Sequence, residues 1–266
     1  MDGFPPISAM CLTYGRPELL EEAIQSFLLQ DYPGVKEMLV LNDWGAQVLQ
    51  CDHPEVCVVN VPRRFRTVGE KRNAAAALAR HDLLFVWDDD DIYLPHRLSF
   101  SVRMLDPAKG FFKPSKAWQL DKGRVSGPKS NLFHSGGCWT RALFDRVGGY
   151  PHVGSGQDMA IELAFERVIG RGKNFNGITP ADLFYLYRWG GGGSYHLSAF
   201  GRDTDGSAAG QAKVDEFLRR AVDKRLQRTG AIELRPAWRD DYPALVSAAI
   251  DRLTAASNAV EGRRVN

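Results

Sequence analysis

The chain has 266 residues, of which 44% are hydrophobic and 25% are charged, and its formal net charge is +2. This composition is typical of an ordinary globular protein with a sizeable core, and it excludes collagen, a coiled coil and extensive disorder. The near-neutral charge also argues against a dedicated nucleic-acid coat protein. The length predicts one large domain followed by a tail.

The four cysteines, Cys11, Cys51, Cys57 and Cys138, form no C-x-x-C pair and match no zinc-finger spacing. We therefore expect reduced thiols that act as small buried side chains in a cytosolic protein. The N-terminal residues lack the basic and apolar regions of a signal peptide. Because no apolar run approaches the roughly 20 residues that a membrane span needs, we expect a cytoplasmic protein without transmembrane segments.

Hydrophobic periodicity predicts alternating strands and helices in the first 105 residues. Strands are expected at 7–12, 37–41, 56–61 and 83–87, and helices at 17–28, 69–80 and 95–105. Pro17 suits the first turn of a helix because its fixed φ is already helical. This order of elements predicts an α/β fold with a mostly parallel sheet, in which ligands bind at the carboxyl ends of the strands.

The second half of the chain is less regular. We expect antiparallel strands at 109–120 and 125–139, helices at 140–147 and 158–169, a strand at 182–189, a glycine loop at 190–193, a mobile polar segment at 199–210, and helices at 214–226 and 241–256. The apolar stripe at 214–226 has the spacing of an amphipathic helix. The sequence thus predicts a helical C-terminal extension.

An acidic run, Asp88 to Asp91, directly follows the apolar strand expected at 83–87. Adjacent carboxylates repel one another, so we expect an opposing charge to relieve this repulsion. A hard divalent cation such as Mg²⁺ or Mn²⁺, bridging to phosphate oxygens, fits this chemistry. The alternative is a solvated turn that caps a helix.

A basic stretch precedes the acidic run and contains Arg63, Arg64, Arg66, Lys71 and Arg72. Arginine side chains and the N-terminus of the helix expected at 69–80 both favour phosphate binding. A solvated loop and a nucleic-acid contact are the alternatives, although no basic and aromatic interleaving extends the stretch.

Two further residues suit a reaction centre. Asp158 follows a glycine-rich turn and opens the helix expected at 158–169, so it suits either a general base or a helix cap. His196 lies just after the glycine loop at 190–193, where it would close onto a metal when substrate binds. The glycine loop itself matches neither a P-loop nor a dinucleotide-binding pattern.

Seven short motifs follow these elements in a fixed order. They are TYGRP at 13–17, QDYP at 30–33, ND at 42–43, KRNAA at 71–75, DDDDIYLPHRL at 88–98, GGY at 148–150 and GQD at 156–158. Over roughly residues 7–200 this arrangement resembles the family 2 glycosyltransferases of the GT-A fold. The Q-x-x-R-W signature of processive synthases is absent, which favours an enzyme that makes a single transfer.

The resemblance implies a role for each matching residue. Thr13, Tyr14 and Arg16 would line the base and ribose pocket, Asp43 would accept a hydrogen bond from the base, and Arg72 would reach the base or the diphosphate. Asp88 and Asp89 would complete the nucleotide site, Asp90 would be the principal metal ligand, His196 would match a second one, and Asp158 would be the catalytic base. The cofactor would be Mn²⁺ or Mg²⁺.

The resemblance also implies a domain organisation and a reaction. Residues 1–205 would form the GT-A domain, with a nucleotide-binding half at 1–105 and an acceptor half at 106–205, and residues 206–266 would form the helical extension. The activity would be inverting transfer of a sugar from a nucleotide diphosphate sugar to an acceptor hydroxyl. We expect the donor sugar to be linked to UDP. The acceptor would be a glycan, a lipid-linked glycan, a small molecule or a modified nucleic acid. A metal-dependent sugar nucleotidyltransferase and a non-catalytic carbohydrate- or nucleotide-binding module remain open.

Overall fold

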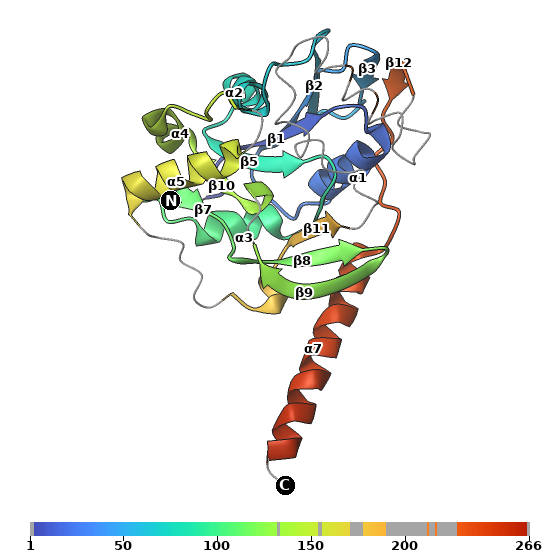
Figure 1. Cartoon of the computed structure of the whole chain (residues 1–266), viewed down its shortest axis with the longest axis vertical. Coiled ribbons are helices and arrows are strands. Elements are labelled where there is room, and N and C mark those ends of the chain that lie inside the picture. Colours follow the sequence, from blue (N-terminus) through green and yellow to red (C-terminus); the bar gives the residue numbers. More distant parts are fainter. Residues whose placement is uncertain are drawn as a thin grey trace.

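The computed structural model describes residues 3–131, 134–153, 156–170, 178–189, 212, 216 and 228–264. Its centre is a six-stranded sheet in the order β4-β2-β1-β5-β10-β7 (Figure 1). The strands are β1 (Ile7–Thr13), β2 (Lys36–Asn42), β4 (Val56–Asn60), β5 (Leu83–Asp88), β7 (Phe111–Phe112) and β10 (Cys138–Thr140). The first four pair in parallel, and β10 runs antiparallel to β5 and β7. The predicted mostly parallel α/β sheet is therefore confirmed.

Helices cover both faces of this sheet, which explains why β2 is buried along its whole length and β1 at every residue but Leu12. Five helices flank the sheet: α1 (Pro17–Leu28), α2 (Val68–Leu78), α3 (Arg97–Met104), α4 (Arg141–Val147) and α5 (Gln157–Ile169). Alternate residues of β1 face opposite sides, so Cys11 shares a core with Ile24 of α1 and Leu98 of α3. Its neighbour Met10 shares the other core with residues of α2, α4 and α5.

A second sheet, in the order β6-β11-β8-β9, lies beside the first. It contains β6 (Ile92–Tyr93), β8 (Lys116–Asp121), β9 (Arg124–Ser130) and β11 (Tyr185–Trp189). The acidic run connects the two sheets, because it leaves the first at the end of β5 and enters the second at β6. Short 3₁₀ turns at His134–Gly136 and Pro180–Asp182 precede β10 and β11.

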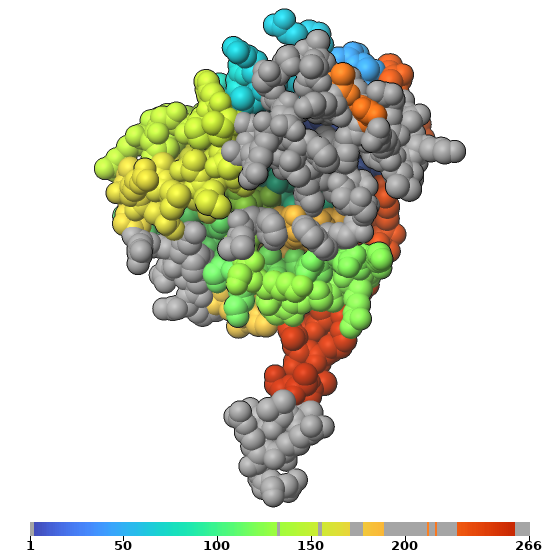
Figure 2. Space-filling model, viewed as in Figure 1, coloured from blue at the N-terminus to red at the C-terminus, as the bar shows by residue number. Residues whose placement is uncertain are grey.

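The C-terminal segment returns to the main body rather than standing apart from it. β12 (Gly230–Glu233) pairs in parallel with β3 (Gln47–Gln50), and Ile232 and Leu234 join the core that includes α1. α7 (Tyr242–Arg264) then packs its first turns against the molecule and projects away from it (Figure 1). Figure 2 shows the β8–β9 hairpin on the surface next to the start of α7. Within the described ranges, no helix combines the length and apolar character that crossing a membrane requires.

The strands expected at 109–120 and 125–139 are only partly correct. Residues 116–130 do form an antiparallel hairpin, but β7 and β10 split off and join the main sheet. The strand β12 was not expected, because its partner β3 lies about 180 residues earlier in the chain. All four cysteines are free, as predicted, but Cys51 and Cys57 are only half-buried. The helix expected at 214–226, except for residue 216, and the boundary expected at 205–206 lie outside the described residues.

Candidate functional site

A cavity of about 130 Å³ opens at the carboxyl ends of β1, β2 and β5. This is where a parallel α/β sheet places its ligands. Eight residues predicted from the sequence to bind nucleotide or metal line this one cavity: Thr13, Tyr14, Arg16, Asp43, Arg72, Asp88, Asp89 and Asp90. The tertiary structure thus brings together side chains that come from four separate segments of the chain.

Arg16 neutralises the middle of the acidic run. Its guanidinium donates to Asp89 and, at 2.8 Å, to Asp90. Both carboxylates are buried. Burial raises the pKa of Asp89 to about 6, because the opposing effect of Arg16 is too small to offset it and the charge of Asp90 acts in the same direction. The repulsion predicted for this run is therefore relieved in part by a side chain of the protein itself.

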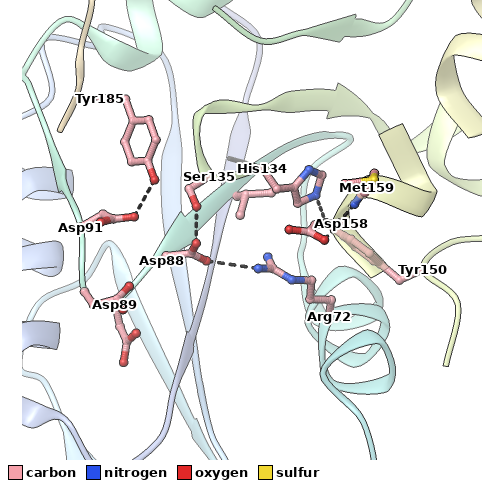
Figure 3. Close-up of polar contacts among 12 residues, drawn as sticks. Arg72, Asp88, Asp89, Asp91, His134, Ser135, Tyr150, Asp158, Met159 and Tyr185 are labelled. Carbon is pink, nitrogen blue, oxygen red and sulfur yellow. Dashed lines mark hydrogen bonds and ion pairs between the residues drawn. The ribbon is translucent and has the colours of Figure 1, made fainter. Parts of the chain in front are cut away.

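The outer carboxylates of the run have different partners (Figure 3). Asp88 accepts hydrogen bonds from Arg72, at 3.3 Å, and from the Ser135 hydroxyl. Burial alone would raise the pKa of Asp88, but these two contacts lower it below its usual value. Asp91 accepts from the Tyr185 hydroxyl at 2.7 Å, and burial together with the neighbouring carboxylates raises its pKa.

The acidic run has the chemistry of a site for a hard cation. Ligand oxygens of Asp88, Asp90 and Asp91 lie within 4.8 Å of one another. Carboxylate oxygens are the ligands that Mg²⁺ and Mn²⁺ prefer. Both oxygens of Asp91 are engaged by the Tyr185 hydroxyl and the Arg188 amide, so Asp91 also ties β11 to the run. The residues present fit a divalent cation that uses oxygens of Asp88 and Asp90.

Asp43 is held rigidly at the end of β2. One oxygen pairs with the buried ammonium of Lys71, and the other accepts from the Phe65 amide at 2.9 Å. Lys71 also donates to the Thr13 carbonyl at 2.7 Å, which ties α2 to the end of β1. The structure therefore fixes the orientation of Asp43 before any ligand binds.

An aromatic wall at the cavity consists of Tyr14, which lines the cavity, and Trp44, which directly follows Asp43 and packs against the Tyr14 ring. The rings of Tyr14 and Trp44 are stacked, with centroids 5.8 Å apart and an interplanar angle of 28°. The Arg64 guanidinium lies 5.4 Å from the centre of the Tyr14 ring, in cation–π geometry. The Nη1 atom of Arg64 is buried and has no hydrogen-bond partner. This wall presents flat apolar surface together with an unused donor.

Asp158 is the second residue of α5 and is half-buried. Gly156, with φ 77°, occupies the N-cap position, and the Asp158 side chain accepts from the Met159 amide at 2.8 Å. Burial would lower the pKa of Arg72, but Asp88, Tyr150 and Asp158 raise it. The carboxylate of Asp158 therefore lies within electrostatic reach of Arg72, although it does not line the cavity. His196 lies outside the described residues.

Sequence reasoning did not assign several residues that the structure places at the site. Phe65, Thr67 and Val68 line the cavity and were not singled out from the sequence. Arg64 and Lys71 also line it and Asp91 belongs to the carboxylate cluster, but the sequence pointed to these three only as members of the basic stretch and the acidic run, without individual roles. Lys71 and Arg64 belong to the basic stretch, so their charge was a signal. Ser135 gave no signal, because its contact with Asp88 spans 47 positions in the sequence.

With this geometry described, the chain can be compared with known families. Residues 8–114 match the family model described as glycosyl transferase family 2. Over this part the chain is similar to that family. The match includes β1 to β5 and the whole acidic run, so it confirms the resemblance and supports the prediction of a glycosyltransferase. No sequence among the curated proteins matches the chain.

Solved structures show the same fold. S. aureus TarS 1–349 is 14% identical, with a TM-score of 0.55, and the match covers 83% of this chain and 67% of that chain. Mannosyltransferase PcManGT from Pyrobaculum calidifontis, solved with GDP-Man and Mn²⁺, is 18% identical, with a TM-score of 0.54, and the match covers 96% of this chain and 76% of that one. TarS 1–349 has also been solved with UDP-GlcNAc. At this identity the likeness shows the fold alone, and it confirms the predicted GT-A architecture. The match covers only 41% of the longer TarS structure.

Proposed function

We propose that this protein is a glycosyltransferase that moves a sugar from a nucleotide diphosphate sugar to an acceptor hydroxyl, with inversion and with Mn²⁺ or Mg²⁺. The family match over residues 8–114 and the complexes of the structural relatives with UDP-GlcNAc and GDP-Man support the donor class. The observation that carries the proposal is the single cavity in which the predicted donor-site residues meet. We infer a UDP-linked donor, as the sequence resemblance implies.

In this proposal the cavity binds the donor through two regions. The Tyr14 ring, which is stacked on Trp44, supplies a flat surface for the base, and the fixed carboxylate of Asp43 accepts from a base N–H. Arg72 lies at the other end beside Asp88, where its guanidinium pairs with diphosphate oxygens. A divalent cation on Asp88 and Asp90 would stabilise the charge that develops on the leaving diphosphate. Arg16 must then release Asp90 and can pair with the donor.

Asp158 acts as the general base of the transfer. It takes the proton of the acceptor hydroxyl as that oxygen bonds to the anomeric carbon. The bond between the anomeric carbon and the diphosphate oxygen breaks on the opposite face, so the configuration inverts. Arg72 is assigned to the leaving group and also lies within electrostatic reach of Asp158. A positioned base of this kind contributes about 10²–10⁴-fold to the rate.

A ligand screen tests the proposed donor class. The melting temperature is measured with UDP, UDP-GlcNAc, GDP and GDP-mannose, each with and without Mn²⁺, because ligand binding stabilises the fold by mass action. We expect a shift with one of these nucleotide sugars that requires Mn²⁺. Product analysis then separates the alternatives: release of a nucleoside diphosphate supports sugar transfer, and release of pyrophosphate from a nucleoside triphosphate with a sugar phosphate supports a nucleotidyltransferase. If no nucleotide shifts the melting temperature, the proposal is wrong.

A further inference from the structure

A buried chain of polar side chains runs behind the cavity, from α2 to α5. Glu162 accepts two hydrogen bonds from the Lys113 ammonium, at 2.7 and 2.6 Å, and one from His134 Nδ1 at 2.8 Å. The other ring nitrogen of His134 lies 2.6 Å from the Tyr150 hydroxyl. All four side chains are buried, and none of them lines the cavity. The proposed reaction makes no use of this chain of contacts.

The direction of each hydrogen bond follows from the chemistry of its partners. Burial would raise the pKa of Glu162, but hydrogen bonds from His134 and Lys113 lower it to about 2, so its carboxylate only accepts. Burial lowers the pKa of His134, which is therefore neutral and carries its single proton on Nδ1. Its Nε2 must then accept from the Tyr150 hydroxyl. This leaves one consistent arrangement of protons along the chain.

At one end the chain is fixed to the donor side of the site. Asn73 of α2 bonds the backbone of Tyr150 twice, at 2.8 Å to its amide and 2.8 Å to its carbonyl. Gly149 permits this approach, because a Cβ atom there would lie 2.8 Å from Asn73 Oδ1. The Tyr150 ring lies under the Arg72 guanidinium, 5.6 Å from its centre. Tyr150 therefore supports the side chain that we assign to the diphosphate.

At the other end the chain is fixed to the helix that carries the base. Glu162 lies four residues after Asp158 on α5, so the two side chains share one face of the helix. Because Lys113 and His134 hold Glu162 inside the protein, they also set the rotation of α5 about its axis. That rotation determines where Asp158 points relative to Arg72 (Figure 3).

We propose that Tyr150, His134 and Glu162 are positioning residues that hold Asp158 at a fixed place relative to Arg72, and so align the base with the leaving group. This inference rests on the proposed function of Asp158. Lys113 completes the chain by neutralising Glu162. None of the three residues touches substrate in this proposal.

The main variant is Glu162→Gln, which keeps the shape of the side chain but turns one acceptor into a donor. Lys113 contacts both oxygens of Glu162, so in either orientation the new NH₂ group faces the Lys113 ammonium, and only one orientation keeps an acceptor for His134. Glu37→Gln is the matched control, because Glu37 is also a buried carboxylate, bonded to Ser8 and Arg80, and it does not line the cavity. Release of UDP from UDP-GlcNAc, or of GDP from GDP-mannose, is measured with Mn²⁺.

We expect Glu162→Gln to lower kcat about tenfold to a hundredfold, within the range that misplacement of a reacting group costs, with the donor KM changed less than about threefold. Glu37→Gln should lower the melting temperature without this change in kcat. In an Asp158→Asn background, Glu162→Gln should cost nothing further, because there is no base left to align. Equal kcat for Glu162→Gln and wild type, or a full additional loss in the double variant, overturns the inference.

Two further measurements keep the inference testable if turnover is slow or Glu162→Gln folds poorly. Tyr150→Phe keeps the ring under Arg72 and removes only the hydroxyl, and it should lower kcat without adding to the effect of Glu162→Gln. Nitrogen NMR should show the Nδ1–H form of His134 in the wild type; the Nε2–H form there overturns the chain of contacts. If Asp158→Asn keeps the wild-type rate, the proposed function itself is wrong. If Asp158→Asn loses activity but Glu162→Gln does not, only the positioning role is disproved.

Discussion

The ion pairs that line the cavity and the buried chain behind it use the same kinds of side chain for opposite purposes. Arg16 and Arg72 pair with carboxylates on the cavity wall, where a donor or a cation can replace them. Lys113 and His134 pair with Glu162 away from the cavity wall. Both regions pair buried charges, as low-dielectric surroundings require. Access to ligand, rather than composition, separates the exchangeable pairs from the permanent ones.

The largest effect should come from removing the carboxylate of Asp90, which Arg16 must release before a cation can bind there. We expect Asp90→Ala to abolish Mn²⁺-dependent binding of the donor, because the carboxylate cluster then retains only Asp88 and Asp91 and lacks the proposed main ligand. Calorimetric titration of UDP with and without Mn²⁺ measures this. Asp82→Asn is the control, since the Asp82 side chain is 90% exposed. Undiminished Mn²⁺-dependent binding in Asp90→Ala would exclude the metal role of Asp90.

The next largest effect concerns the proposed base. Asp158→Asn should lower the rate of nucleoside diphosphate release by about 10²–10⁴-fold, because the amide cannot accept the proton. Donor affinity should stay unchanged, since Asp158 does not line the cavity. Single-turnover kinetics and calorimetry on the same preparation separate the two quantities. Asp145→Asn, at an exposed position on α4, should match the wild type in both.

Because Lys113 and His134 pair with Glu162 inside the protein, we expect the folded state to lose stability in acid. The Glu162 pKa is about 2 in the folded protein and about 4.5 when unfolded, so its contribution is fully present above pH 4.5 and is lost as the pH falls towards 2. The lowered pKa of His134 acts in the same direction below its ordinary value of 6.5. The full contribution of Glu162 is about 3 kcal/mol. Urea unfolding of the wild type and Glu162→Gln across this range should give curves that converge at low pH; parallel curves would contradict the prediction.

The smallest effect concerns Arg64, whose buried Nη1 atom has no hydrogen-bond partner within the protein. Arg64→Gln should weaken binding of the nucleoside diphosphate about tenfold, which corresponds to one charge-assisted hydrogen bond of about 1.4 kcal/mol. The buried Nη1 atom and its place on the cavity wall are the reasons. Calorimetry with UDP and Mn²⁺ measures the affinity, and Arg63→Gln, at an exposed position, serves as the control. Equal affinities for Arg64→Gln and wild type would remove Arg64 from the site.

Much of the donor side could be predicted from the sequence. Thr13, Asp43 and Asp88 each follow an apolar strand, and the carboxyl ends of parallel strands meet at one edge of a sheet, so their convergence follows from local patterns and topology. Their individual roles stay predictions, as does the role of Asp158. The strands at β7 and β10 were assigned less well, because they are two and three residues long and too short for periodicity to distinguish.

The alternation of strands and helices, the α/β class and the position of the acidic run after β5 follow from local sequence patterns, because periodicity and turn residues act over a few neighbouring positions. The pairing of Arg16 with Asp89 and Asp90, the pairing of β12 with β3, and the contacts of Glu162 with Lys113 and His134 became visible only in the folded chain. These contacts join residues separated by 28 to 183 positions, and partners so far apart are chosen by the packing of the whole core. The net charge of +2 reveals neither kind of ion pair, because the opposite charges of each pair cancel in the sum.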